Sequence, residues 1–293
     1  MKLIKQSFEF INQTDFSLIG IKKHIERCAR VSYKSEDKIT DTSYEKFVNM
    51  LESRGHNRPL EFGTVYLTLR GDDTNALRNI FTYTENPWTK IRKQVIKAEY
   101  DPNTHVVLNY VTTNYRVIVE NHLEEDLKYL CEPTEYHYKR YTAHMVLDRG
   151  VMDEFRTHVG LSHLAESTRY CNYSKDKFDN EITFIKPCWL DDEKLKLYGP
   201  YHTVIRDKSP ESIFIANLNN VERDYLDLIK LGWTPQQARS ILPLGIKSEL
   251  ISCGFEDAWK NFFYRRDAPD AHPMAQEIAN PMHQKFIELT KIE

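Results

Sequence analysis

The chain has 293 residues, with 40 Lys and Arg against 43 Asp and Glu, so its formal net charge is −3. This length is sufficient for one or two domains with a buried core. A hydrophobic content of 41% and a charged content of 28% are typical of a globular protein rather than a disordered or fibrous one. The near-neutral charge disfavours binding to nucleic acid or to an anionic membrane, since both usually require a basic excess.

Glycine usage narrows the kinds of ligand site that the chain can form. The sequence contains 10 glycines, roughly half of the usual share of about 7%. It contains no glycine-rich phosphate loop and no Gly-x-Ser-x-Gly or His-Glu-x-x-His motif. We therefore expect any bound phosphate to be held by side chains rather than by backbone amides.

Cysteine usage and the start of the chain indicate in which cellular compartment the protein is expected. The five cysteines are odd in number, widely spaced and free of any Cys-x-x-Cys pair, which is typical of reduced thiols in a cytoplasmic protein. The first residues contain no apolar segment of the kind found in signal peptides, and no apolar run approaches the length of a membrane span. We expect a soluble, cytoplasmic protein without a membrane partner.

The predicted elements, in chain order, come from apolar periodicity and from capping residues. They are a helix over 16–32, a helix after the capping box Thr42-x-x-Glu45, strands over 65–69, 105–119 and 136–147, a helix over 151–159, a strand over 182–185, a long helix from Ser209-Pro210 to Gly232, and a helix opened by Thr234-Pro235-x-Gln237. Helices, then strands, then a mostly helical last third indicate an α+β fold. No linker interrupts the chain, so we predict a single domain over residues 1–293.

One segment contains several side chains that could bind a ligand. Ser167, Thr168 and Arg169 supply two hydroxyl donors and a guanidinium fork, which together suit a phosphate monoester. Taken alone, the same residues also fit an ordinary polar loop. His158 and His163 lie five residues apart, a spacing that does not align metal ligands on one helix face, and no metal site is predicted.

This segment resembles the signature of the flavin-dependent thymidylate synthases. That signature reads Arg-His-Arg, seven residues, Ser, then Arg-Tyr two residues further on, and His158, Ser167 and Arg169-Tyr170 match it. Three other blocks resemble family segments in the same order along the chain: Gly55-His56-x-x-Pro59-Leu60-Glu61, Gln237-Ala238-Arg239-x-x-Leu242-Pro243, and Asn261-Phe262-x-x-x-Arg266 followed by His272.

The resemblance implies a fold with a central, mostly antiparallel sheet flanked by helices. It also implies transfer of a one-carbon unit from methylenetetrahydrofolate to C5 of dUMP, giving dTMP, with reduced FAD as hydride donor and NADPH as reductant of the flavin. Family members are homotetramers whose sites combine several subunits. The matching positions are Arg266 as the catalytic residue; Glu154, Glu166, Ser167, Thr168, Arg169, Arg239 and Arg266 for the nucleotide; and His56, Arg156, His158, Asn261 and His272 for the flavin.

The departures from the signature keep other functions open. Thr157 and Val159 stand where the motif has arginines, and Arg156 lies one position early. Because these positions belong to the flavin site, one alternative is a pyrimidine nucleotide hydroxymethylase, in which water captures the methylene intermediate. A second is a non-enzymatic nucleotide or nucleic-acid binder that stacks bases on its aromatic side chains. Cys171 is interpreted as a buried small residue rather than as a nucleophile that attacks C6.

Overall fold

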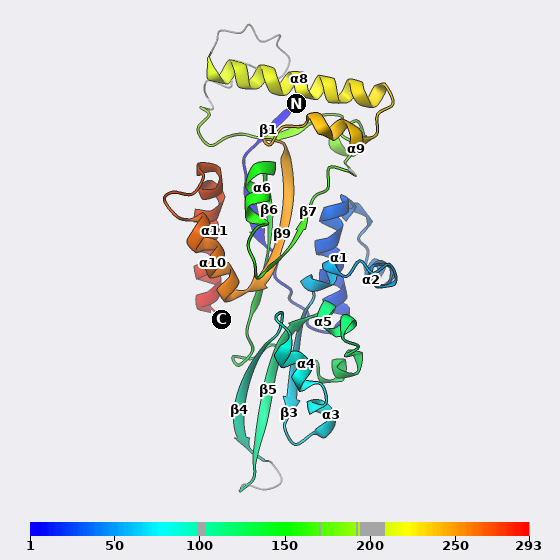
Figure 1. Cartoon of the computed structure of the whole chain (residues 1–293), viewed down its shortest axis with the longest axis vertical. Helices are drawn as coiled ribbons and strands as arrows, with labels where there is room; N and C mark the ends of the chain where they lie inside the picture. Colours follow the sequence, from blue (N-terminus) through cyan, green and yellow to red (C-terminus); the bar gives the residue numbers. More distant parts are fainter. Residues whose placement is uncertain (99–102, 170, 192, 194–208, 293) are drawn as a thin grey trace.

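The computed structural model describes residues 1–98, 103–169, 171–191, 193 and 209–292. The molecule is elongated, with sheets arranged along its long axis (Figure 1). A four-stranded sheet occupies the middle, a three-stranded sheet forms one end, and the long helix α8 (Pro210–Lys230) crosses the other end.

The middle sheet holds the main core. Its strands are antiparallel neighbours in the order β2 (Ser7–Phe10), β6 (Arg140–Asp148), β9 (Lys247–Phe255) and β7 (Leu161–Ala165). Alternate side chains of β6 and β9 point to opposite faces, as in any strand. One face packs under α10 (Glu256–Arg266) and α11 (Pro273–Ile292), and the other contacts α1 (Leu18–Tyr33).

The three-stranded sheet has its own apolar core. Its order is β3 (Thr64–Arg70), β5 (His105–Asn114) and β4 (Lys90–Lys97), all antiparallel. Short helices contribute to this core: α2 (Ser43–Ser53), α3 (Thr74–Leu77), α4 (Ile80–Glu85), α5 (Tyr115–Glu120), η2 (Arg58–Phe62) and η3 (Glu124–Tyr129). The short turn η1 (Glu36–Lys38) lies against α1.

At the opposite end, a short parallel pair joins the beginning of the chain to its middle. β1 (Lys2–Ile4) pairs with β8 (Thr183–Ile185), and the remaining elements there are η4 (Asp176–Phe178), α8, α9 (Pro235–Ala238) and η5 (Arg239–Ile241). The helix α6 (Arg149–Phe155) follows β6 directly and packs against β6 and β9 of the middle sheet (Figure 1).

The predicted α+β class is confirmed: antiparallel sheets are flanked by helices. The long helix begins as expected, since the Ser209 side chain accepts a hydrogen bond from the backbone N–H of Ser212. The capping box at Thr234 and Gln237 is also formed.

Other boundaries were predicted wrongly. The strand expected over 105–119 ends at Asn114, because the Asn114 side chain accepts from the N–H of Val117 and starts α5. Thr42 makes no capping hydrogen bond. The helix expected over 151–159 begins at Arg149, capped by Asp148, and ends at Phe155. The last third contains β9, which lies between β6 and β7 in the middle sheet.

Three further features concern the described part of the chain. No helix in it has the length and apolar character needed to cross a membrane. Its cysteines are free thiols, of which Cys28, Cys171 and Cys253 are buried. Among these residues, no group of three His, Cys, Asp or Glu side chains could hold a metal ion.

Gly254 marks the closest approach between β9 and β7. A Cβ at this position would lie 2.5 Å from Cδ2 of Leu161 and 2.9 Å from the carbonyl oxygen of Gly160. Gly254→Ala is therefore expected to lower the free energy of unfolding by about 1–3 kcal/mol, as overpacked cores do. Gly245→Ala is the control, since a Cβ there meets nothing within 4 Å. Urea unfolding measures both, and equal stability of the two variants would contradict this packing.

Candidate functional site

Many of the predicted site residues line one of two cavities, to each of which residues in or next to α6 contribute. The first, which we term the arginine pocket, has a volume of about 320 Å³. Its polar lining consists mainly of four arginines and the segment after β7: Arg58, Arg149, Arg156, Arg239, Glu166, Ser167 and Thr168. The second, the Arg266 cavity, has a volume of about 840 Å³ and contains Glu154, Arg266 and His272.

Several elements contribute to the arginine pocket. Arg149 begins α6 and Arg156 follows its last residue, so both ends of this short helix reach the pocket. Arg58 begins η2, and Arg239 follows α9. The guanidinium Nη1 of Arg239 donates to Oγ1 of Thr168 at 3.3 Å. This contact joins α9 to the segment that carries the hydroxyl groups.

The pocket is strongly positive. Arg149 and Arg156 share one carboxylate partner, Asp153, each at 3.4 Å. Arg58 and Arg239 form no ion pair with any carboxylate that the structure describes. Unpaired guanidinium groups in a concave site attract and orient anions, and a phosphate monoester accepts their forked hydrogen bonds. The arrangement therefore suits a phosphate held by side chains.

Ser167 and Thr168 line this pocket, whereas Arg169 lies outside it. The Nε of Arg169 donates to Oε1 of Gln236 in an exposed contact. Gln236 is close to Arg239 in the sequence but does not line the pocket. Tyr170 lies outside the described residues.

Arg266 is held rigidly at the edge of its own cavity. Its Nε donates to Nε2 of His158 at 2.7 Å, Nη1 donates to Oε2 of Glu154 at 2.9 Å, and Nη2 donates to the backbone carbonyl of Glu154 at 2.9 Å. These bonds tie the last turn of α10 to the end of α6. They fix the direction in which a permanently charged guanidinium faces the cavity.

His158 contributes to this arrangement as a neutral side chain. Burial, together with the charges of Arg266 and Arg265, lowers the pKa of His158 from 6.5 to about 4. A neutral ring can accept the hydrogen bond from Arg266 at Nε2. The ring also packs edge-on against Phe262, at 4.9 Å between centroids, and only 5% of the residue is exposed.

The residues predicted for the flavin are dispersed within one chain. His56 lines a separate cavity of about 400 Å³, Arg156 lines the arginine pocket, and His272 lines the Arg266 cavity. Asn261 is exposed on α10, and His158 is buried against Arg266. These five side chains do not converge within one chain, and the resemblance implies a flavin site that combines several subunits.

The structure also places residues at the pocket that sequence reasoning missed. Arg58 and Arg149 line it, yet no ligand role was predicted for them. Their only sequence signal is proximity to matching blocks, since Arg58 lies inside the Gly55–Glu61 block and Arg149 shortly precedes the signature.

Cys171 is unsuited to nucleophilic attack. The residue is fully buried, and its thiol donates to Oε1 of Glu166 at 3.3 Å. Burial and the charge of Glu166 raise the pKa of this thiol well above its ordinary value. The thiolate, which is the nucleophilic form, is therefore disfavoured.

Comparison with known proteins identifies the family. The fold and the arginine pocket define an α+β protein with a cavity lined by several arginines. A sequence model of the family described as "Thymidylate synthase complementing protein" matches residues 132–290, more than half of the chain. The chain therefore belongs to this family of thymidylate synthase-like methyltransferases, and the resemblance seen in its motifs is confirmed.

Two other comparisons concern solved structures and curated proteins. The chain is similar to the crystal structure of a UMP/dUMP methylase, PolB from Streptomyces cacaoi, bound with 5-Br dUMP. That likeness has 16% sequence identity and a TM-score of 0.43, and covers 99% of this chain and 93% of that chain. Among curated proteins, no sequence matches this one.

The neutral state of His158 predicts how stability depends on pH. Because its pKa falls from 6.5 to about 4 on folding, the unfolded chain binds more protons between these values. The free energy of unfolding therefore increases as pH rises through this window. The stability that the neutral histidine contributes is lost as pH falls through the same window. In urea unfolding at a series of pH values, His158→Gln should flatten this slope by up to about one proton, whereas His105→Gln, at an exposed position on β5, should leave it unchanged. A slope unaffected by His158→Gln would show that the histidine is not held neutral.

Proposed function

We propose that the protein transfers a one-carbon unit from methylenetetrahydrofolate to C5 of dUMP or of a closely related pyrimidine deoxynucleotide. Family membership supports this chemistry. The observation that carries the nucleotide part is the arginine pocket, where Arg58 and Arg239 face a cavity beside Thr168 without a carboxylate partner in the described chain. A nucleoside 5′-phosphate supplies the negative charge that these groups lack.

C5 of uracil must become electron-rich before it can attack the one-carbon donor. One route adds a thiolate to C6, and the buried state of Cys171 argues against that residue in this role. A second route stabilises negative charge over N3 and the ring carbonyls, so that C5 becomes nucleophilic directly. A fixed guanidinium suits this second route, because it remains charged and needs no reorientation during the reaction.

Arg266 is the residue proposed for that task. Glu154 and His158 hold its guanidinium in place. Within one chain, however, Arg266 and Arg239 line different cavities. We therefore propose that a complete site combines the arginine pocket of one subunit with the Arg266 cavity of a neighbouring subunit in a homotetramer, each subunit being a single domain. Analytical ultracentrifugation tests this directly: a fully active monomer would contradict it.

The fate of the one-carbon unit distinguishes two candidate functions. In the first, reduced FAD supplies a hydride and the product is dTMP, with NADPH reducing the flavin. In the second, water captures the methylene intermediate and the product is the hydroxymethyl nucleotide. The observation that favours the second candidate is the 90% exposure of Val159, which stands where the family signature has an arginine.

Product analysis separates these candidates. Purified protein is incubated with dUMP and methylenetetrahydrofolate, with and without FAD and NADPH, and the nucleotide product is examined by mass spectrometry. A methyl product that requires FAD and NADPH supports the first function, and a hydroxymethyl product formed without NADPH supports the second. No modified nucleotide under any of these conditions would contradict the proposed function.

Arg266→Ala is expected to abolish turnover while dUMP binding stays measurable, because the residue acts on the base rather than on the phosphate. Turnover is followed by product formation and binding by calorimetry. Circular dichroism and thermal unfolding check that the fold is intact, and Arg266→Lys tests whether positive charge alone suffices. Near-normal turnover of the folded Arg266→Ala variant would show that the assigned role is wrong.

Arg239→Ala is expected to weaken dUMP binding by about 10- to 100-fold, the usual loss for one charge-assisted hydrogen bond. Arg223→Ala is the matched control, since Arg223 is an exposed arginine on α8 that pairs with Asp224. If Arg239→Ala binds dUMP as tightly as Arg223→Ala, the phosphate does not occupy the arginine pocket.

A further inference from the structure

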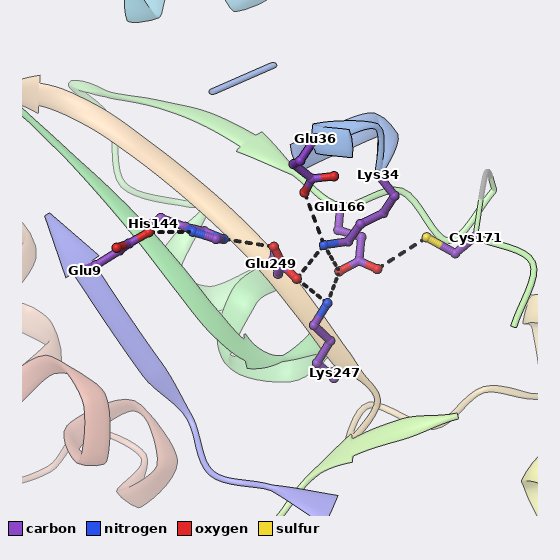
Figure 2. Close-up of polar contacts among 8 residues, drawn as sticks. All are labelled: Glu9, Lys34, Glu36, His144, Glu166, Cys171, Lys247 and Glu249. Carbon is purple, nitrogen blue, oxygen red and sulfur yellow. Dashed lines mark hydrogen bonds and ion pairs between the residues drawn. The ribbon is translucent and has the colours of Figure 1, made fainter. Parts of the chain in front are cut away.

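Four charged side chains form a cluster that is connected to the arginine pocket through Glu166. We term Lys34, Glu166, Lys247 and Glu249 the lysine–glutamate cluster (Figure 2). The Nζ of Lys247 donates to Glu166 at 2.9 Å and also to Glu249. The Nζ of Lys34 pairs with Glu249 and lies 3.7 Å from Glu166. Each carboxylate therefore contacts both ammonium groups.

Three separate parts of the chain meet in this cluster. Lys247 and Glu249 are two residues apart on β9 and share one face of the strand. Glu166 follows β7, and its backbone N–H donates to the carbonyl of Glu249 at 2.8 Å. Lys34 follows α1 with φ 48° and ψ 54°, a left-handed conformation that is uncommon for lysine.

Further ionisable side chains lie around the cluster. The Nε2 of His144 donates to Oε2 of Glu249 at 2.9 Å, its Nδ1 lies 3.4 Å from Glu9, and Glu36 lies 3.7 Å from Lys34 (Figure 2). Burial alone would raise the pKa of Glu249, but the hydrogen bond with His144 and the charges of Lys247 and Lys34 lower it. Burial alone would lower the pKa of Lys247, but the charges of Glu166 and Glu249 raise it. Both groups are therefore charged at neutral pH.

Glu166 is the member that connects this cluster to the anion site. Glu166 is one of the residues that line the arginine pocket, beside Ser167 and Thr168, and it also lines a second cavity of about 310 Å³ together with Lys34 and Lys247. Its side chain is only 1% exposed, and its carboxylate contacts both ammonium groups. Without counter-charges, a carboxylate at this position would repel a phosphate in the pocket, since such charges interact strongly in partly buried sites. The two ammonium groups offset that repulsion.

We propose that Lys34 and Lys247 set the affinity of the arginine pocket for anions by neutralising Glu166, without touching the ligand themselves. They are positioning residues, because they act through Glu166. The inference rests on the proposed function only in the identity of the nucleotide. It assigns a role in anion binding to two lysines that line a different cavity from the four arginines and contact Glu166, which lines both.

A purely structural role for the cluster predicts different behaviour. If the lysines served only to hold α1, β7 and β9 together, removal of a second cluster member would add to the damage. If they serve to neutralise Glu166, removal of its negative charge repairs the loss of a lysine. Double variants therefore separate the two explanations.

The test measures dissociation constants for two probes, dUMP and inorganic phosphate, by calorimetry. Lys34→Met should weaken binding of both probes about tenfold. Lys34→Arg should bind within about twofold of the wild type, because it keeps the positive charge, and Lys34→Met/Glu166→Gln should bind more tightly than Lys34→Met, because it restores the balance of charge in the cluster. Lys230→Met, at an exposed lysine on α8 that pairs with Asp227, is the control and should change neither constant.

Each outcome supports or overturns the inference. Normal binding by Lys34→Met, or a double variant that binds as weakly as Lys34→Met, overturns it. If Lys34→Met does not fold, Glu166→Gln alone decides, since the inference requires that it bind phosphate more tightly than the wild type. If phosphate shows the expected pattern but dUMP does not bind the wild type, the proposed nucleotide is wrong and the inference stands. If neither probe binds the wild type, both fail.

Discussion

The pairing of β9 with β6 on one side and β7 on the other is the constraint on which the site depends. The β6–β9 register extends from Arg140 opposite Phe255 to Asp148 opposite Lys247. This pairing brings the end of β7, and therefore Glu166, beside the charged start of β9. It also sets where α10 begins, and so where Arg266 meets the end of α6. A shift in this register by one residue would move every β9 side chain to the opposite face.

The same arrangement solves an electrostatic problem. The residues that line this guanidinium-rich pocket include a buried acid, Glu166. An isolated buried charge is costly, and within an anion site it would also oppose the ligand. Alternating lysine and glutamate side chains remove both difficulties, because each charge has opposite neighbours and the cluster sums to zero.

The sequence predicted local features well and long-range ones poorly. Ser209-Pro210 and the Thr234 capping box fixed helix starts, because a cap depends on a few adjacent residues. The strand β9 was missed: its Lys-Ser-Glu start has no clean apolar alternation, since one of its faces carries the charged cluster. The arginine pocket was partly predicted through Ser167, Thr168 and Arg239. Arg58 entered it from another element, a proximity that depends on tertiary packing rather than on any motif.

The left-handed turn at Lys34 has a consequence for protein engineering. Backbone preference alone would recommend glycine or asparagine at φ 48°, and such a replacement relieves strain at the end of α1. It would also delete an ammonium group that lies against Glu249 and near Glu166. Sequence optimisation aimed at thermal tolerance would thus select against lysine here, and a more robust protein obtained in this way would have lost a counter-charge next to its ligand pocket.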